Sequence, residues 1–370
     1  MKISRIARIG AIGAIAALAL AGCAANEGAA PKSSDSSAPA AAALKGTISG
    51  QGSSAQGTAQ TTWIAGIQAD SSPDLNINYD PQGSGAGRKA FISGAVDFAG
   101  SDAALKDEEL ASTFAACAPD SKAIDLPVYI SPIAIAYNVE GLDELKLDAA
   151  TTAKIFSGKI TKWNDPAIAA LNDGAKLPAA DIVVVHRSDD SGTTQNFSEY
   201  LGANAGDIWG TDLGQTFPYQ VGDAAKGTSG VADAAKNAAN SITYIDESGI
   251  GNTGLKVAQL KVGDAFSTLS ADGAAAVVAA SPLVEGRADN DLAIAIDRTN
   301  TEANAWPLVL VSYVIGCQQY ADAEKGKLVS GYFQYIASDA AQKAAAESAG
   351  SAPLSSELAA KVLTAAKSIK

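Results

Sequence analysis

Residues 182–201, which read IVVVHRSDDSGTTQNFSEYL, change from the pattern of a strand to that of a helix within a few positions. The run 182–185 consists of Ile and Val, and β-branched residues favour strands. Further on, Phe197, Tyr200 and Leu201 lie at i, i+3 and i+4, which is the spacing of one helix face. The stretch therefore predicts a strand, a polar loop and a helix, in that order.

The same alternation continues along most of the chain. Short β-branched or aromatic runs predict strands, and apolar residues at helical spacing predict helices between them. Strands are expected at 75–79, 124–129, 133–137, 182–185, 242–245 and 308–315, and helices at 165–171, 193–201, 230–239, 327–337 and 355–366. Strands that alternate with helices indicate an α/β fold.

The composition argues against several classes of function. The 370 residues carry 27 Lys and Arg against 40 Asp and Glu, a net charge of −13, and they contain no basic stripe suited to nucleic acid. One His and three Cys leave little material for a metal site, so we expect no metal and no other cofactor. No Gly-x-Ser-x-Gly motif occurs, and His186 at the end of a β-run is interpreted as a structural residue. The sequence therefore argues against a metalloenzyme, a serine hydrolase and a nucleic-acid binder, and we expect a protein that is not an enzyme.

The N-terminus has the pattern of a targeting segment. Three cations within residues 1–8 precede an apolar stretch at 9–21. The stretch ends in Leu20-Ala21-Gly22-Cys23, which resembles the lipobox of bacterial lipoproteins. We therefore expect residues 1–22 to be a signal peptide and Cys23 to carry lipid. An ordinary secretory signal with an incidental Cys is the alternative.

Export has consequences for the mature chain. Cleavage before Cys23 removes three cations, and 24 minus 40 leaves a net charge of −16. Residues 23–46, rich in Ala, Ser, Gly and Pro, are expected to be a flexible linker. In an oxidising compartment Cys117 and Cys317 are expected to form a disulfide, and two buried free thiols are the alternative.

Four segments, at 50–54, 83–88, 97–102 and 187–194, combine Gly with hydroxyl or charged side chains. Gly lets the backbone approach a ligand closely, and Ser, Thr and free N–H groups donate hydrogen bonds to oxyanions. In the fourth segment, Ser191, Gly192 and Thr193 open the predicted helix, so their N–H groups lie at its positive end. Arg187 adds donors there, and Asp189 is placed to hold Arg187.

Each of these features has a plainer interpretation. A Gly-rich segment is often a simple turn. Asp102 has the position of a helix cap for residues 103–105, and Ser-Gly-Thr after a strand is often a helix cap as well. Arg187 and Asp189 have the spacing of a surface ion pair, which contributes little to stability.

Five short stretches occur in the order that is typical of one family. They are Asn78-Tyr79, VDFAGSD at 96–102, GKITKWNDP at 158–166, RSDDSGT at 187–193 and Trp306-Pro307-Leu308. Together they resemble one known family, the phosphate-binding proteins that supply phosphate-specific ABC transporters. The resemblance runs from about residue 47 to the C-terminus.

The resemblance implies contacts to one phosphate ion. Ser54 and Ser84 match hydroxyl donors, and Asp102 matches the carboxylate that accepts a proton from the ligand. Arg187 matches a cationic clamp that Asp189 orients. The phosphate-binding residues implied are Ser54, Ala55, Ser84, Asp102, Arg187, Ser191, Gly192 and Thr193.

Two positions depart from the family pattern. Ser54-Ala55-Gln56 stands where the family often has Thr-Phe-Pro, so an aromatic wall is missing and the backbone N–H of Ala55 is the donor left there. Asp190 stands where Gly is common and places an extra negative charge near the mouth of the site.

The resemblance also implies a two-lobed fold that closes on its ligand. Lobe one is expected at 47–134 and 306–370, and lobe two at 135–305. Two crossing strands, near 133–137 and 306–311, would join the lobes.

The expected function is the capture of inorganic phosphate and its delivery to the permease of an ABC transporter. The protein would work outside the cytoplasm, held to the outer face of the cell membrane by its lipid anchor. Binding of another tetrahedral oxyanion, such as sulfate, molybdate or a phosphonate, is the alternative, and a phosphatase is a more distant one. Because the mature chain is acidic, recognition of an anion has to come from short-range hydrogen bonds in a water-poor cleft.

Overall fold

The computed structural model describes residues 43–370. The predicted signal peptide, Cys23 and nearly all of the predicted linker lie outside the described residues. The strands are β1 (Gly46–Gly52), β2 (Leu75–Asp80), β3 (Phe98–Ser101), β4 (Ala123–Asn138), β5 (Lys146–Leu147), β6 (Val183–Arg187), β7 (Asp223–Ala225), β8 (Ser241–Asp246), β9 (Lys256–Val257), β10 (Gln259–Val262), β11 (Ala265–Ser267) and β12 (Val309–Cys317).

The helices are α1 (Gly57–Asp70), α2 (Ser84–Ile92), α3 (Asp107–Leu110), α4 (Ala149–Phe156), α5 (Pro166–Ala169), α6 (Gly192–Trp209), α7 (Gly227–Asn237), α8 (Ala271–Ala280), α9 (Ala323–Ile336), α10 (Asp339–Ala349) and α11 (Ser356–Ser368). Two short 3-10 helices, η1 (Glu247–Gly249) and η2 (Gly251–Thr253), follow β8. Within residues 43–370, none of the helices is both long and apolar enough to cross a bilayer.

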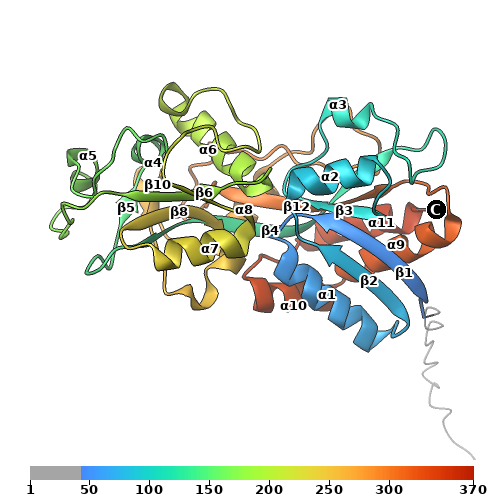
Figure 1. Ribbon diagram of the computed structural model, residues 1–370. Coiled ribbons are helices and arrows are strands. Elements are labelled where there is room, and N and C mark those ends of the chain that lie inside the picture. The colour runs from blue at the N-terminus through green and yellow to red at the C-terminus, as the bar shows by residue number, and fades with distance from the viewer. Residues whose placement is uncertain (1–42) are drawn as a thin grey trace, which may run out of the picture. The chain divides into compact units, whose positions relative to one another are not determined.

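One large sheet contains most of the strands, in the order β2-β1-β3-β12-β4-β8-β6-β7, with β9 paired to β4. β1 is parallel to β2 and β3, and β6 is parallel to β7 and β8. The central strands β12 and β4 are antiparallel to their neighbours. In Figure 1, α2 and α6 lie on one side of this sheet and α1 and α7 on the other. This is the α/β fold predicted from the sequence.

The central strands form the most buried part of the sheet. All residues of β12 are buried, and so are all residues of β4 except Asn138. The sequence predicted two strands, 124–129 and 133–137, where the structure has the single strand β4. The first part of β4, as far as Pro132, pairs with β12, and the second part, from Ile133 onwards, pairs with β8. The break in the sequence pattern therefore marks a change of partner rather than the end of a strand.

Several helices were missed from the sequence because few large apolar residues mark their buried faces. In α1 the buried residues are Ala59, Gln60, Trp63 and Ile67, of which two are large and apolar. Most of α8 and α10 consists of Ala. Helical periodicity is weak in such segments, because small residues change little in hydropathy from one face to the other.

The lobe boundaries expected from the resemblance remain a prediction. One half of β4 pairs with β12 and the other half with β8, so the strand joins two groups of neighbours. Residues 287–294 were assigned to lobe two, yet Leu292 N–H donates to the carbonyl of Asp125 at 2.9 Å and Arg287 donates to that of Leu105 at 2.6 Å. A division at residue 305 would cut across these contacts.

The disulfide expected between Cys117 and Cys317 is present, with the two Cα atoms 5.4 Å apart. It closes a loop of 200 residues between β12 and the segment before β4. A loop of this length is worth on the order of 4 to 5 kcal/mol in the chain-entropy model, and native strain usually reduces that figure.

We expect reduction of this disulfide to lower the free energy of unfolding by up to about 4 to 5 kcal/mol without abolishing ligand binding. Urea unfolding of the Cys117→Ser/Cys317→Ser variant measures the stability, and ligand titration of the folded variant measures the binding. Alkylation of the unreduced wild-type chain, followed by mass measurement, checks the bond itself. Two modified thiols in the denatured, unreduced chain would contradict it.

Candidate functional site

The sheet contains two groups of parallel strands, β1 with β2 and β3, and β6 with β7 and β8. The two groups run toward each other, which brings the loops at their carboxyl ends together. β3 runs in the same direction as the first half of β4, toward Pro132, because both are antiparallel to β12. β8 runs in the opposite direction and ends at Asp246, which pairs with Ile133. Ligand sites in α/β sheets lie outside the carboxyl ends of the strands. Here the carboxyl ends of both groups face the middle of β4. The predicted phosphate-binding residues lie at these strand ends, in the loops that follow them, or in the first turns of α2 and α6.

Asp102, directly after β3, is a buried acceptor surrounded by hydroxyl groups. Its Oδ1 accepts hydrogen bonds from Ser53 and, at 2.6 Å, from Ser312, and its Oδ2 accepts from Ser84 at 3.3 Å. Asp102 is 3% exposed. Burial raises the pKa of its carboxyl, although the hydrogen bonds from Ser312 and Ser53 and the charge of Arg187 act in the opposite direction.

Gly192, the first residue of α6, lies against Asp102 and Ser84. A Cβ at this position would be 2.5 Å from the Asp102 Cβ and 2.6 Å from the Ser84 Oγ. Only a residue without a side chain allows the helix to approach this closely. The contact joins the fourth Gly-containing segment to the second and third.

Arg187, the last residue of β6, is held in a fixed orientation by Asp189. Its Nε donates to Asp189 Oδ1 at 2.7 Å and its Nη2 donates to Oδ2 at 2.6 Å. The side chains of Arg187 and Asp189 are 4% and 11% exposed, so this is not a surface pair. Burial alone would raise the pKa of Asp189, but the hydrogen bonds and charge of Arg187 and the N–H of Gly227 outweigh it and lower the pKa.

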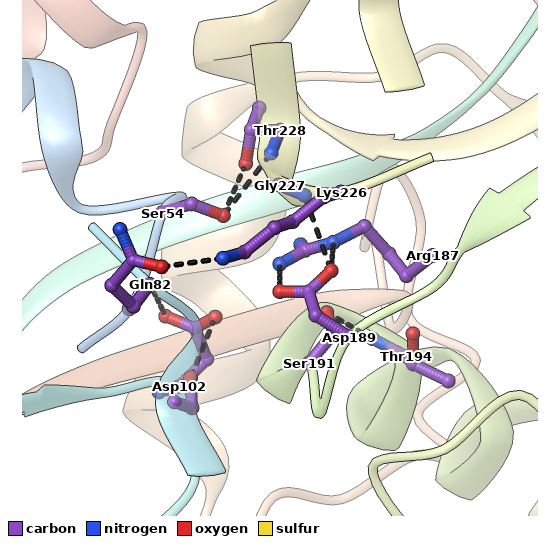
Figure 2. Close-up of polar contacts among 12 residues, drawn as sticks. Ser54, Gln82, Asp102, Arg187, Asp189, Ser191, Thr194, Lys226, Gly227 and Thr228 are labelled. Carbon is purple, nitrogen blue, oxygen red and sulfur yellow. Dashed lines mark hydrogen bonds and ion pairs between the residues drawn. The ribbon is translucent and has the colours of Figure 1, made fainter. Parts of the chain in front are cut away.

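Ser54, from the loop after β1, contacts the start of α7. Its Oγ lies 3.1 Å from Thr228 Oγ1 and accepts the Thr228 N–H, also at 3.1 Å. In the same region Lys226 donates to Gln82, which follows β2. Figure 2 shows these two contacts next to the pair formed by Arg187 and Asp189. Ala55 is fully buried in the same loop.

The N-terminus of α6 has donors that the protein does not use. The Ser191 Oγ caps the helix by accepting the Thr194 N–H at 3.1 Å, and the Ser191 N–H donates to Gln215 O at 3.0 Å. The Ser191 backbone donor is therefore occupied, but its hydroxyl hydrogen remains available. The Thr193 hydroxyl is buried and has no hydrogen-bond partner among residues 43–370. A buried hydroxyl without a partner is costly unless a ligand supplies one.

Asp190, which departs from the family pattern, has its charge partly neutralised. Lys89 on α2 donates to its Oδ2 at 2.9 Å, and the Thr216 hydroxyl donates to its Oδ1 at 3.1 Å. The hydrogen bond from Lys89 lowers the pKa of Asp190. The Gly85 N–H also donates to the backbone carbonyl of Asp190 at 3.3 Å. Asp190 therefore joins α2 to the loop after β6.

Comparisons with known proteins place this chain in a family. The PBP superfamily domain matches residues 37–340. Phosphate-binding protein PstS 3 of Mycobacterium leprae is 38% identical over 325 residues, which are 85% of this chain and 86% of that protein. The chain belongs to the PstS family of phosphate-binding proteins. PstS of Pasteurella multocida is more distant, at 31% identity over 78% of this chain and 80% of that protein.

Solved structures agree with this assignment at the level of the fold. A phosphate-binding protein from Stenotrophomonas maltophilia superimposes with a TM-score of 0.66 at 21% identity, over 86% of this chain and 94% of that one. A phosphate ABC transporter substrate-binding protein from Clostridium perfringens, described with bound phosphate, has a TM-score of 0.57 at 18% identity, over 82% of this chain and 98% of that one. The PstS chain described here therefore shares their architecture.

The helix-cap interpretation of Asp102 is wrong. Residues 103–105 are not helical, and the next helix, α3, begins at Asp107. The ring of His186 stacks on Phe217 with centroids 4.1 Å apart, which agrees with the structural interpretation of this residue. Among the described residues no group of three or more His, Cys, Asp or Glu is arranged to hold a metal ion.

Sequence reasoning missed four residues of this candidate site. Ser53 is adjacent to the predicted Ser54 and bonds Asp102, so its place in the same Gly-rich segment was the available signal. Ser312 and Thr228 carried no such signal, because each is an ordinary polar residue far along the chain from its partner. Asn196, the fifth residue of α6, bonds the Asp102 carbonyl and was not singled out from the sequence.

Asp246 next to the site provides a pH-dependent contribution to stability. It is fully buried, and burial raises its pKa to about 7 although the Ser248 hydroxyl donates to it. Burial and the charge of Asp246 also raise the pKa of Glu247 to about 7. The folded protein therefore keeps protons that unfolded carboxyl groups release near about pH 4.

We expect the free energy of unfolding to fall as the pH rises from about 4 to about 7, by up to about 1.4 kcal/mol per pH unit for each such group. Asp246→Asn is expected to flatten this dependence, because the amide carries no titrating proton and no charge to act on Glu247. Urea unfolding at several pH values measures the slope, with Asp264→Asn, an exposed carboxylate, as the control. A wild-type slope in Asp246→Asn would contradict the assignment.

Proposed function

We propose that this PstS protein captures inorganic phosphate outside the cytoplasm and delivers it to the permease of a phosphate ABC transporter. One observation carries the proposal: a buried carboxylate acceptor, Asp102, lies in contact with a helix N-terminus that has unused donors. An oxyanion that carries both a negative charge and a proton matches such a site. The family is one of binding proteins, in agreement with the prediction that the chain is not an enzyme.

The donors and the acceptor have distinct roles in this proposal. Arg187 uses two of its five N–H donors on Asp189, which leaves three for the ligand. The hydroxyls of Ser191 and Thr193 and the backbone N–H groups of Gly192 and Thr193 bind further oxygens at the positive end of α6. Asp102 accepts the hydrogen of the phosphate P–OH group. Ser54, Ala55 and Ser84 complete the proposed contacts.

Short-range contacts offset the acidic charge of the protein. At physiological salt, surface charges act over about 8 Å, so the net charge has little influence inside a closed site. Each hydrogen bond to a charged ligand contributes about 1.5 to 3 kcal/mol. The contacts come from loops of both groups of parallel strands, so phosphate would stabilise an arrangement in which these loops are close together.

Calorimetric titration of the mature protein with phosphate, sulfate and arsenate tests the proposed function. We expect phosphate to bind with one site per chain and sulfate to bind at least about 100-fold more weakly. Tighter binding of sulfate than of phosphate would point to the alternative, a protein for another tetrahedral oxyanion. Absence of phosphate binding would refute the proposal.

We also propose that Cys23 anchors the protein to the outer face of the cell membrane. The support is the sequence Leu20-Ala21-Gly22-Cys23 after an apolar stretch. Cys23→Ala is expected to release the protein from the membrane fraction or to block removal of residues 1–22. Fractionation of cells, with mass measurement of the processed chain, checks this. A variant that is cleaved normally and still found in membranes would contradict the lipid anchor.

A further inference from the structure

Asn196, the fifth residue of α6, faces Asp102 and joins the two sides of the proposed site. It is 2% exposed, and its Nδ2 donates to the carbonyl of Asp102 at 2.7 Å and to that of Gly192 at 2.9 Å. One amide group therefore binds both the loop after β3 and the helix that follows β6. In the sheet, β12, β4 and β8 lie between β3 and β6.

The orientation of the Asn196 amide is set by Arg298. Arg298 is 7% exposed, and its Nη2 donates to Asn196 Oδ1. The same nitrogen donates to Glu199 Oε2 on α6 at 2.9 Å, and Nη1 donates to the carbonyl of Val309. Because a guanidinium group can only donate, it fixes the carbonyl oxygen of Asn196 toward itself and the N–H₂ group toward Asp102.

The same contacts continue into the acceptor of the site. Val309 begins β12, and Ser312 on the same strand donates to Asp102 Oδ1 at 2.6 Å. Asp102 is thus held through its carboxylate by Ser312 and through its backbone by Asn196. Arg298 connects these two supports, because it bonds both Asn196 and the start of β12.

We propose that Asn196, oriented by Arg298, is a positioning residue that holds the N-terminus of α6 against Asp102 and so slows the release of phosphate. The inference rests on the proposed function. The Asn196 amide and the Asp102 carbonyl meet when the two loops are close together, and they would be hydrated if the loops separated. The hydrogen bond therefore stabilises the arrangement in which Asp102 and the donors of α6 act on the same ligand.

The test is stopped-flow measurement of phosphate association and dissociation with Asn196→Ala. We expect dissociation to become about 10- to 100-fold faster, because the buried Asp102 carbonyl loses its donor. Association and the urea midpoint of the ligand-free protein should change little. A wild-type dissociation rate in this variant would overturn the proposal, and so would a weaker affinity matched by an equal loss of stability in the ligand-free protein.

Asn204 on the same helix provides a matched control. Its Nδ2 also donates to a carbonyl one turn earlier, that of Tyr200, and to one outside the helix, that of Arg298, both at 2.9 Å. Asn204→Ala removes the same kind of amide but keeps the side chain of Asn196 and the guanidinium group of Arg298 that orients it, because Asn204 bonds only the backbone carbonyl of Arg298. We therefore expect wild-type release of phosphate. Equally fast release in Asn204→Ala would overturn the proposal, because any loosening of α6 would then suffice.

A second variant covers the case in which Asn196→Ala fails to fold. Asn196→Asp keeps the shape of the side chain and an acceptor that faces Arg298, but it has no N–H to donate to Asp102. We expect this variant to fold and to release phosphate faster than the wild type, and wild-type release would overturn the proposal. Failure of wild-type protein to bind phosphate would instead refute the proposed function, so the two failures are distinguishable.

Discussion

Asp102→Asn is expected to collapse the ratio of phosphate affinity to sulfate affinity while the fold persists. In the wild type, both carboxylate oxygens of Asp102 accept hydrogen bonds from serine hydroxyls, and the side chain is buried. Phosphate at neutral pH carries at least one proton that such an acceptor can receive, whereas sulfate carries none. An ionised Asp102 therefore faces sulfate with lone pair against lone pair.

The size of the effect follows from the cost of a buried acceptor without a donor. That cost is about 1 to 3 kcal/mol, and it is larger for a charged group that also repels the ligand. Each 1.4 kcal/mol is about tenfold in affinity, so we expect the wild type to prefer phosphate about 100-fold or more. The amide that Asp102→Asn introduces would donate to sulfate and would carry no charge, so the ratio should fall close to one. Parallel titrations with the two ions measure it.

Two controls make this prediction specific to Asp102. Asp97 directly precedes β3, and Asp102 directly follows that strand. Asp97 bonds Ser49 and Lys325, neither of which is a residue of the site. Asp97→Asn should keep the wild-type preference. In the wild type, acidification should reduce the preference for phosphate, because a protonated Asp102 can donate to sulfate, and burial raises the pKa at which this occurs. A wild-type ratio in Asp102→Asn would leave the carboxylate without a role in selectivity.

The site residues whose proximity could be predicted from the sequence are those that lie close together along the chain. Arg187, Asp189 and Ser191 lie within five positions, between a clear strand and a clear helix, so their proximity follows from the local pattern. Ser312 lies 210 residues from Asp102. It occupies one position of an otherwise apolar strand, and nothing in its neighbourhood distinguishes it from a serine that fills space. Only the pairing of β12 with β3 and β4 brings it to the carboxylate.

The same reasoning explains which parts of the fold were predicted. Strands β6 and β12 contain runs of β-branched and other apolar residues, and β2 and β8 combine Ile with Tyr or Leu, so these four strands were recognised. β1 contains three Gly among seven residues, so its sequence is typical of a loop. A Cβ at Gly50 would lie 2.2 Å from the ring of Phe98, and a Cβ at Gly52 would lie 1.9 Å from the carbonyl oxygen of Gly100, so both positions need Gly. Close packing against β3 thus removed the sequence signal for a strand.

Arg187→Met is expected to lower the affinity for phosphate by on the order of 1,000-fold. At least two of the three N–H donors that Asp189 leaves free can bind phosphate, and each such bond contributes about 1.5 to 3 kcal/mol. Together they correspond to about two to four powers of ten in affinity. The variant also leaves the carboxylate of Asp189 buried and without its cation, which costs stability and repels the anion.

The double variant Arg187→Met/Asp189→Asn separates these two effects. Neutralising Asp189 should restore most of the stability of the ligand-free protein, because an amide oxygen still accepts the Gly227 N–H and no unpaired charge remains. The affinity for phosphate should stay low, because the donors of Arg187 are missing. Arg287→Met removes an arginine, with a side chain 10% exposed, from an ion pair with the buried Asp125, and should reduce stability with little effect on affinity. If the double variant bound phosphate as tightly as the wild type, Arg187 would support the fold and would not act as the cationic clamp.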